Sequence, residues 1–212
     1  MAEVIAEVTS GSVTVTGTGS ASAPPDVAVI DVAAEVSAAH ASEALELAGA
    51  ALTRMRDAAL SGGVQPADLA TSGTQLWPET DQRGRPNGYR AMLSMTVRSR
   101  EIRSVSDLLP ALIAAGGDAG RLHNIRLEFS DPASLASTAR ERAFADARAR
   151  AQQYADLAGR GLGEVVLVEE GGSPGGGPSP VFRMAAVVSE SVPVEPGMQS
   201  VSASVTVRWG LG

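Results

Sequence analysis

The amino-acid sequence predicts an α+β fold: two strand–helix–strand–strand units that form antiparallel sheet covered by helices, one of them long and rich in alanine. Two observations predict it. Several segments alternate apolar and polar residues, which is typical of strands with one face on a core and the other toward water. Three further segments repeat apolar residues every three or four positions, which is typical of amphipathic helices.

The strands differ in how clearly they show this alternation. It is sharpest over 201–209, where valine and tryptophan alternate with serine, threonine and arginine. The segment 27–36 is apolar at nearly every position, which indicates a strand in the middle of a sheet. We expect strands near 13–16, 27–36, 69–77, 88–98, 123–130, 164–170 and 198–209.

Two of the helices are expected in the first two thirds of the chain. The first spans about 42–61, and Gly62 and Gly63 provide its stop. The second is short, about 106–115. Because proline is tolerated best in the first turn of a helix, we expect Pro110 to lie near the first turn.

The third helix is expected over 132–159, with Asp131 as its N-cap and Pro132 at its first position. Alanine on the packed face would let the backbone of a neighbouring element come close. We place Asp146 and Arg150, with Arg142 before them, on the water-facing side as i, i+4 pairs. The predicted packed stripe is Leu135, Ala139, Ala143, Ala147, Ala151, Tyr154 and Ala158.

These elements predict a single domain over 1–212 that is built from two similar halves, about 12–103 and 104–212. The exception is the segment 171–198, which begins GGSPGGGPSP and has no apolar period. We expect it to be a flexible loop, of a kind that often serves binding or assembly.

The composition excludes whole classes of chemistry. All 17 basic residues are arginine and there is no cysteine, which excludes lysine Schiff bases, P-loop lysines, thiolate metal sites and disulfides. The net charge of −7 disfavours nucleic acid and anionic membranes as partners. No cofactor is implied.

The sequence gives two expectations about cellular location. No stretch is long and apolar enough for a membrane span, and the first basic residue is Arg54, so no secretory signal is evident. The chain as written is therefore expected in the cytoplasm. A mature exported protein would look the same, which leaves the periplasm or cell envelope as the alternative.

The glycine-rich motifs do not predict catalysis. Gly17-Thr18-Gly19 lacks the third glycine and the helix of a dinucleotide fingerprint, and favours a turn between two strands. Gly171, Ser173 and Gly175 match a nucleophile elbow, but no helix follows them.

The two histidines, His40 and His123, lack partners at metal-ligand spacing, and we expect both at the surface. We therefore predict no catalytic residue and no metal ligand.

Four residues are candidates for interaction: Trp77, Arg83, Arg85 and Tyr89, which lie at or beside a polar hairpin tip. Tryptophan, tyrosine and arginine are enriched at interaction hot spots, although each aromatic could instead pack under its own hairpin. The tip belongs to a basic stretch whose one acid beyond the tip is Glu101. Its arginines are Arg83, Arg85, Arg90, Arg98, Arg100 and Arg103.

Segments along nearly the whole chain resemble the SIMPL domain family. The closing run VPVEPGMQSVSASVTVRWGL (192–211) and the opening run VTVTGTGSASAPPDVAVIDVAAEV (13–36) carry the resemblance, with GYRAMLSMTVR and LHNIRLEFSDP between them. The resemblance implies a bacterial protein, often exported to the periplasm or envelope, without an established biochemical activity. It also implies a link to oligomeric assembly and stress tolerance, and it supplies no catalytic residue.

Three functional hypotheses follow, and the third is an envelope protein whose export signal has been removed. The first is a non-enzymatic, self-associating protein that acts as an interaction or assembly module, with a homo-oligomer as its expected form and any other protein partner unknown. The second is a ligand-binding or enzymatic domain that uses the arginine-rich hairpin to hold a small anion.

Overall fold

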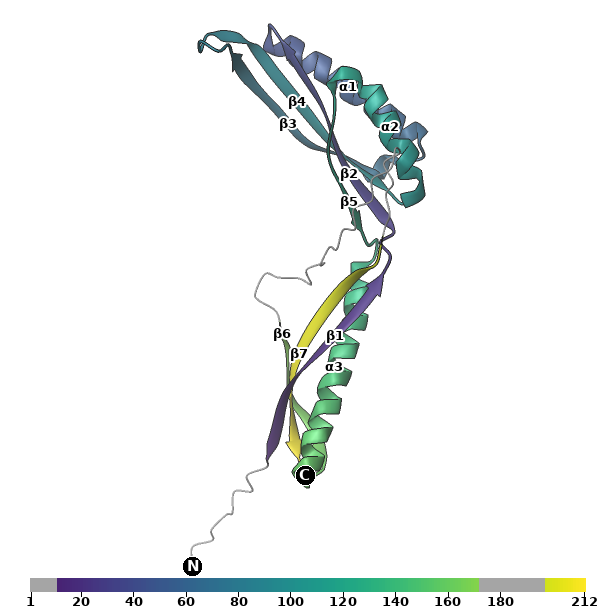
Figure 1. The fold of residues 1–212 in the computed structure, drawn as a ribbon, viewed down its shortest axis with the longest axis vertical. Helices are drawn as coiled ribbons and strands as arrows, with labels where there is room; N and C mark the ends of the chain where they lie inside the picture. Colours follow the sequence, from purple (N-terminus) through teal and green to yellow (C-terminus); the bar gives the residue numbers. More distant parts are fainter. Residues whose placement is uncertain (1–10, 172–196) are drawn as a thin grey trace, which may run out of the picture. The chain divides into compact units, whose positions relative to one another are not determined.

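The computed structural model describes residues 11–171 and 197–212, which form two compact units (Figure 1). The two antiparallel sheets and their helices confirm the predicted α+β class. The three-stranded unit contains β1 (Ser12–Ala23), α3 (Pro132–Leu157), β6 (Leu162–Gly171) and β7 (Gln199–Leu211). The four-stranded unit contains β2 (Val27–Ala38), α1 (Ala41–Ser61), β3 (Leu69–Thr80), β4 (Pro86–Ser99), α2 (Val105–Gly116) and β5 (Gly120–Glu128).

In the three-stranded unit the strand order is β1-β7-β6, and α3 packs on β1 and β7. Gly17 and Gly19 lie on the face of β1 that meets the helix. A Cβ atom at Gly17 would lie 2.2 Å from the carbonyl oxygen of Ala143, so the two backbones touch directly. The prediction of a turn at Gly17-Thr18-Gly19 is wrong: these residues are inside β1, where glycine permits close packing.

The long helix α3 begins as predicted, since the Asp131 side chain accepts a hydrogen bond from the backbone N–H of Ser134 at 3.0 Å and Pro132 is the first helical residue. The predicted stripe is correct at its centre and wrong at its ends, where Tyr154 is 57% exposed. Alanines four apart advance by about 40° around the helix, so the buried row winds with the twisted strands. The buried residues are Ala136, Ala139, Ala143, Ala147, Ala151 and Ala155.

In the four-stranded unit the strand order is β3-β4-β2-β5, which confirms the interior position predicted for 27–36. Helices α1 and α2 cover one face, and the core between the layers is built from larger side chains such as Ile30, Met55 and Leu112. Pro110 lies in the second turn of α2 rather than near its first. The helix continues through it at the cost of the hydrogen bond that a backbone N–H at that position would donate.

The units do not coincide with the predicted halves, about 12–103 and 104–212. Strand β5 belongs to the second predicted half but pairs with β2, and β1 pairs with β7 at the other end of the sequence. The extent of a single domain over 1–212 stays a prediction. The predicted loop 171–198 lies, apart from its ends, outside the described residues.

Candidate functional site

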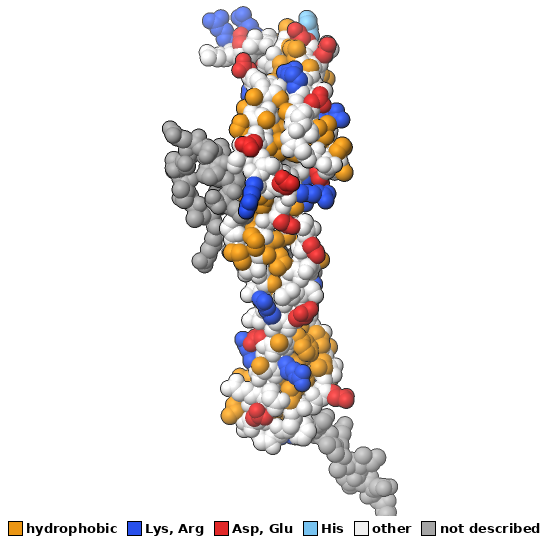
Figure 2. All heavy atoms as spheres, turned by 90° about the vertical axis from the view of Figure 1, so that its right-hand side faces the viewer, with side chains coloured by type: hydrophobic (Ala, Val, Ile, Leu, Met, Phe, Trp, Pro, Cys, Tyr) orange, Lys and Arg blue, Asp and Glu red, His pale blue; other side chains and the backbone are white. Residues whose placement is uncertain are grey.

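The hairpin between β3 and β4 ends in a tight turn that is fixed by Asp81. One oxygen of its carboxylate, Oδ1, accepts hydrogen bonds from the backbone N–H groups of Arg83 and Arg85, at 2.8 and 2.9 Å. Gly84 takes the left-handed conformation that the turn requires, with φ of +74°. The turn therefore holds Arg83 and Arg85 on either side of Gly84 with both exposed, and Figure 2 shows arginine side chains gathered at that end of the unit.

The structure does not bring the two aromatic candidates together. Trp77 lies opposite Arg90 and Tyr89 lies opposite Pro78, so the two rings project from opposite faces of the β3–β4 ribbon. Trp77 is half-buried, whereas Tyr89 is exposed. A single contact surface made of all four predicted residues is not formed at the tip, and their role in interaction stays a prediction.

Three of the six arginines in the basic stretch are neutralised by carboxylates. Arg90 donates to Glu79 at 2.5 Å, Arg98 to Glu128 at 3.2 Å, and Arg100 pairs with Asp68. The stretch therefore does not form one convergent cationic site. Its charge is distributed along β4, from the hairpin tip before the strand to the residues that follow it.

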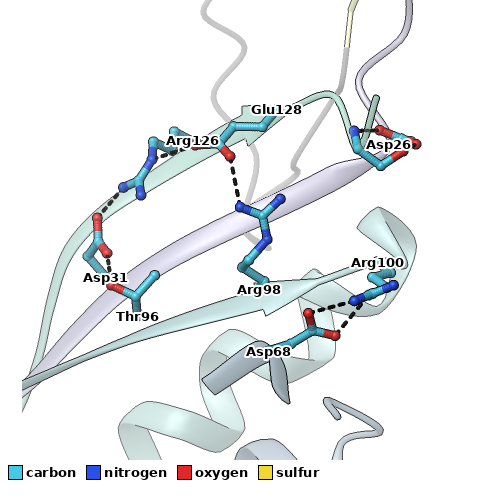
Figure 3. A network of polar contacts seen from close by, with 9 residues as sticks. Asp26, Asp31, Asp68, Thr96, Arg98, Arg100, Arg126 and Glu128 are labelled. Carbon is cyan, nitrogen blue, oxygen red and sulfur yellow. Dashed lines mark hydrogen bonds and ion pairs between the residues drawn. The ribbon is translucent and has the colours of Figure 1, made fainter. Parts of the chain in front are cut away.

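The face of the four-stranded sheet that α1 and α2 leave uncovered carries a network of charges, part of which is drawn in Figure 3. Arg126 bonds Asp31 from one end of its guanidinium and Glu128 from the other, with 2.8 Å between Nε and Glu128 Oε1. Asp31 also accepts a hydrogen bond from Thr96 at 2.8 Å. These long side chains cover Val29, which is fully buried beneath them.

The most buried carboxylate of a described ion pair is that of Asp68, just before β3, which pairs with the exposed Arg100, just after β4 (Figure 3). Nε and Nη2 of Arg100 each donate to one carboxylate oxygen at 2.9 Å, and Asp68 is only 7% exposed. These hydrogen bonds hold the pKa of Asp68 below its ordinary value. A hollow of about 220 Å³ lies beside the pair and is lined in part by Gln65, Arg98 and Ser104.

Asp26 ties the two ends of the four-stranded unit together. Its carboxylate accepts hydrogen bonds from the backbone N–H of Ser130, at 2.7 Å, and from the Ser130 hydroxyl. The backbone N–H of Asp26 donates to the carbonyl of Glu128 at 3.1 Å. The bonds from Ser130 lower the pKa of Asp26 from its ordinary value.

The outer edge of β1 is covered by side chains from α3. Arg142 donates to the carbonyl of Ser20 at 2.5 Å, Arg150 donates to the carbonyl of Thr16 at 2.9 Å, and Asp146 accepts from the backbone N–H of Thr18 at 2.9 Å. The expected pair of Asp146 and Arg150 is formed, at 2.9 Å. However, these side chains do not simply face water: they satisfy the backbone groups that an edge strand leaves unpaired.

The opposite edge of the same sheet has no such cover among the described residues. Strand β6 pairs on one side with β7, and α3 lies mainly over β1 and β7. Four consecutive apolar side chains of β6 are exposed: Val165 by 44%, Val166 by 63%, Leu167 by 40% and Val168 by 50%. Sequence reasoning missed this surface, although the run VVLV breaks the alternation of a half-buried strand and could have signalled it.

The described residues contain no cluster of three or more histidine, aspartate or glutamate side chains that could hold a metal ion. His40 precedes α1 without making a capping hydrogen bond through its side chain, and His123 lies exposed within β5. The nucleophile-elbow match lies outside the described residues from Ser173 onward. Among the helices of the described ranges, none combines the length and the hydropathy needed to cross a membrane.

Comparison with known proteins identifies the family. The model of SIMPL, described as a protein of unknown function (DUF541), matches residues 13–209. The chain belongs to the SIMPL family. The resemblance seen in the sequence is thereby confirmed, and it covers both units of this SIMPL chain.

Two curated relatives place the SIMPL chain among bacterial proteins. It is 33% identical over 209 residues to the 26 kDa periplasmic immunogenic protein of Brucella melitensis, covering 92% of this chain and 82% of that one. It is 28% identical over 171 residues to the uncharacterized protein YggE of Escherichia coli K12, covering 79% and 68%. A solved structure of AtUAH in complex with glyoxylate matches with a TM-score of 0.29 and 11% identity, over 59% of this chain and 33% of that one.

Proposed function

We propose that this SIMPL chain is a non-enzymatic interaction protein that associates with copies of itself through the edge of β6. One observation carries the proposal: four consecutive apolar residues are exposed on a strand that, within residues 11–171 and 197–212, pairs with another strand on one side. An edge of this kind is a template for pairing with another chain. The other edge of the same sheet, β1, is covered by α3, so the contrast lies within one sheet.

The charge arrangement supports an interaction role over catalysis. The ionisable side chains that the structure groups together pair with one another, as Asp68 does with Arg100. The pKa values of Asp26 and Asp68 are both lowered. A buried general acid would instead have a raised pKa. The stress role implied by the family resemblance stays a prediction.

Substituting Val166 by lysine tests the proposal. We expect the wild-type chain to show a native mass by light scattering that is a multiple of 21.6 kDa and rises with concentration. The V166K variant should shift toward the monomer, because a charge on an exposed edge opposes strand pairing. Leu47 on α1, which is 48% exposed, provides the matched control, and L47K should leave the mass unchanged. A strict monomer at every concentration would overturn the proposal.

A second function, the binding of a small anion, is supported by the hollow beside Asp68, which Arg98 and Arg100 line. Arginine forks suit carboxylate and phosphate groups. Because both guanidinium groups are already bonded to carboxylates, an anion would have to compete with Asp68 and Glu128. A thermal-shift screen with inorganic phosphate and simple carboxylates tests this function, and no rise in unfolding temperature would count against it.

We also propose a periplasmic location, which is supported by the name of the Brucella relative. Fractionation of cells that express the gene from its chromosomal start tests the location. Recovery of the protein with cytoplasmic markers alone would contradict it.

A further inference from the structure

A row of three side chains on α3 follows the outer edge of β1 with the spacing of a neighbouring strand. Arg142, Asp146 and Arg150 are four residues apart on the helix, so about 6 Å separates one from the next along its axis. They contact every second residue of β1, and two residues of a strand span about 6.7 Å. The row therefore stays in step with the strand over all three contacts. In order along the helix, the contacted residues are Ser20, Thr18 and Thr16.

The chemistry of the row also matches the edge. The carbonyls of Ser20 and Thr16 accept hydrogen bonds from the two arginines, and the backbone N–H of Thr18 donates to Asp146. A strand added here would bring N–H groups to those carbonyls and a carbonyl to that N–H. The row therefore occupies the hydrogen-bonding positions that an added strand would need. An ion pair of 2.9 Å between Asp146 and Arg150 ties two of its members together.

Strand β1 has little protection of its own. Ser12–Ala23 contains no charged residue and no proline, and these are two of the means by which edge strands avoid pairing with another chain. Its run VTVT (13–16) consists of residues that favour strands. The charges that protect this strand from pairing therefore come from α3.

We infer that the row makes self-association through the three-stranded sheet self-limiting, because it blocks the edge of β1 and leaves β6 as the strand that pairs. For the role of β6 the inference rests on the proposed function. When two copies join through β6, each uses the same surface and the contact ends with that pair. With β1 unblocked, β6 of one copy would pair with β1 of the next. Each added copy would then leave one edge of each kind, and growth would continue until a ring closed or a filament formed.

The row can be removed without disturbing the packing of α3. The helix packs through its buried alanines, which meet Gly17 and Gly19 of β1 directly. The row lies beside this contact, and the side chains of Asp146 and Arg150 are 32% and 50% exposed. Alanine is also the best helix former. We therefore expect alanine variants of the row to keep the fold.

The double variant Asp146→Ala/Arg150→Ala tests the inference. We expect the wild-type mass by light scattering to rise with concentration and then level off. The mass of the double variant should keep rising and exceed the wild-type mass about tenfold or more, because both edges of the sheet can now pair. The matched control is Arg148→Ala/Asp156→Ala, which removes the same residue types from exposed positions of the same helix and should behave like the wild type.

The backbone amide of Thr18 reports on the edge of β1. In the wild type its hydrogen exchange should be slow at every concentration, because Asp146 accepts its hydrogen bond. In the double variant it should exchange about tenfold faster at high dilution, and it should become protected as the copies assemble. Adding Val166→Lys to the double variant should stop the growth and keep this amide unprotected, since β6 supplies the partner strand.

A double variant that behaves like the matched control would overturn the inference. So would growth that leaves the Thr18 amide unprotected or that V166K does not stop. If circular dichroism showed that the double variant does not fold, Arg150→Ala compared with Arg148→Ala would decide the same question.

The inference and the proposed function can fail separately. If V166K blocks self-association of the wild type and loss of the row changes nothing, the proposed function stands and the inference falls. A wild-type chain that stays monomeric overturns the proposed function. Growth of the double variant with a protected Thr18 amide would then still support a β1 edge that the row blocks.

Discussion

The two units of the molecule build their cores in opposite ways. In the three-stranded unit the backbone of β1 rests directly on α3, with glycine on the strand and alanine on the helix. In the four-stranded unit the layers are held apart by side chains such as Met55 and Leu112. The difference shows that one alanine-rich composition supports two kinds of packing. A substitution that adds volume should damage the first unit, and one that removes volume should damage the second.

The largest effect is expected from Gly17→Val. Even the first added carbon would lie 2.2 Å from the carbonyl oxygen of Ala143 and 2.4 Å from the backbone nitrogen of Ala147, and neither backbone atom can move alone. We expect the free energy of unfolding of the three-stranded unit to fall by more than about 3 kcal/mol. Fluorescence of Trp209, read in a Trp77→Phe background, reports on this unit.

Gly49→Ala is the control for that experiment. A Cβ at Gly49 on α1 would meet nothing within 4 Å, and alanine is the better helix former, so we expect a gain of up to about 1 kcal/mol. If Gly17→Val were tolerated as well as Gly49→Ala, direct backbone packing in the three-stranded unit would be contradicted.

Leu112→Ala tests the other half of the comparison. Leu112 is fully buried on α2, and its truncation should lower the free energy of unfolding of the four-stranded unit by about 3 kcal/mol. Urea unfolding that is monitored by hydrogen exchange would assign the loss of stability to this unit. Leu47→Ala, at a half-exposed site, should cost far less, and equal losses at the two leucines would contradict the assigned core.

A smaller effect is expected from acid. Asp26 and Asp68 both lie in the four-stranded unit, and the pKa of each is held below its ordinary value. Because a carboxylate with a lowered pKa in the folded state stabilises the protein above its unfolded pKa, this contribution is complete above about pH 5 and is lost as the pH falls through the folded values.

Lowering the pH should therefore loosen the four-stranded unit, which hydrogen exchange would detect as weaker protection of its amides. Asp68→Asn should make that protection depend less on pH. Asp57→Asn, at an exposed ion pair with Arg56, provides the control and should leave the pH dependence unchanged. A response to acid that is the same in all three proteins would contradict the role of the Asp68–Arg100 pair.

The sequence predicted the elements well and their grouping poorly. In the part of the chain that the structure describes, the seven strands and three α-helices lie at or near their predicted positions, because period, capping residues such as Asp131, and stop signals such as Gly62 act locally. The pairing of β5 with β2 is not local, and the alternation in β5 serves equally well in any sheet. The order of the elements along the chain suggested two consecutive similar halves. The strand pairing instead places β5, from the second predicted half, in the same sheet as β2.

The candidate site shows the same division. Arg83 and Arg85 were found from the sequence because turn residues are recognisable, but the faces of Trp77 and Tyr89 depend on register and were not. The apolar run VVLV of β6 can be seen in the sequence, but its exposure cannot. Its exposure follows from where α3 lies, which depends on glycine at two positions of a strand that is distant in sequence.

The pairing of β1 with β7 also constrains the order in which parts of the chain can fold during synthesis. Ser12 lies opposite Gly210, so the first described strand finds its partner only when synthesis is nearly finished. Residues 25–130 make up most of the four-stranded unit, and the ends of this segment are joined by Asp26 and Ser130. Most of the four-stranded unit therefore emerges during synthesis before β7 does. Strand β1, with its glycines and serines, must wait in an unpaired state until the last strand emerges.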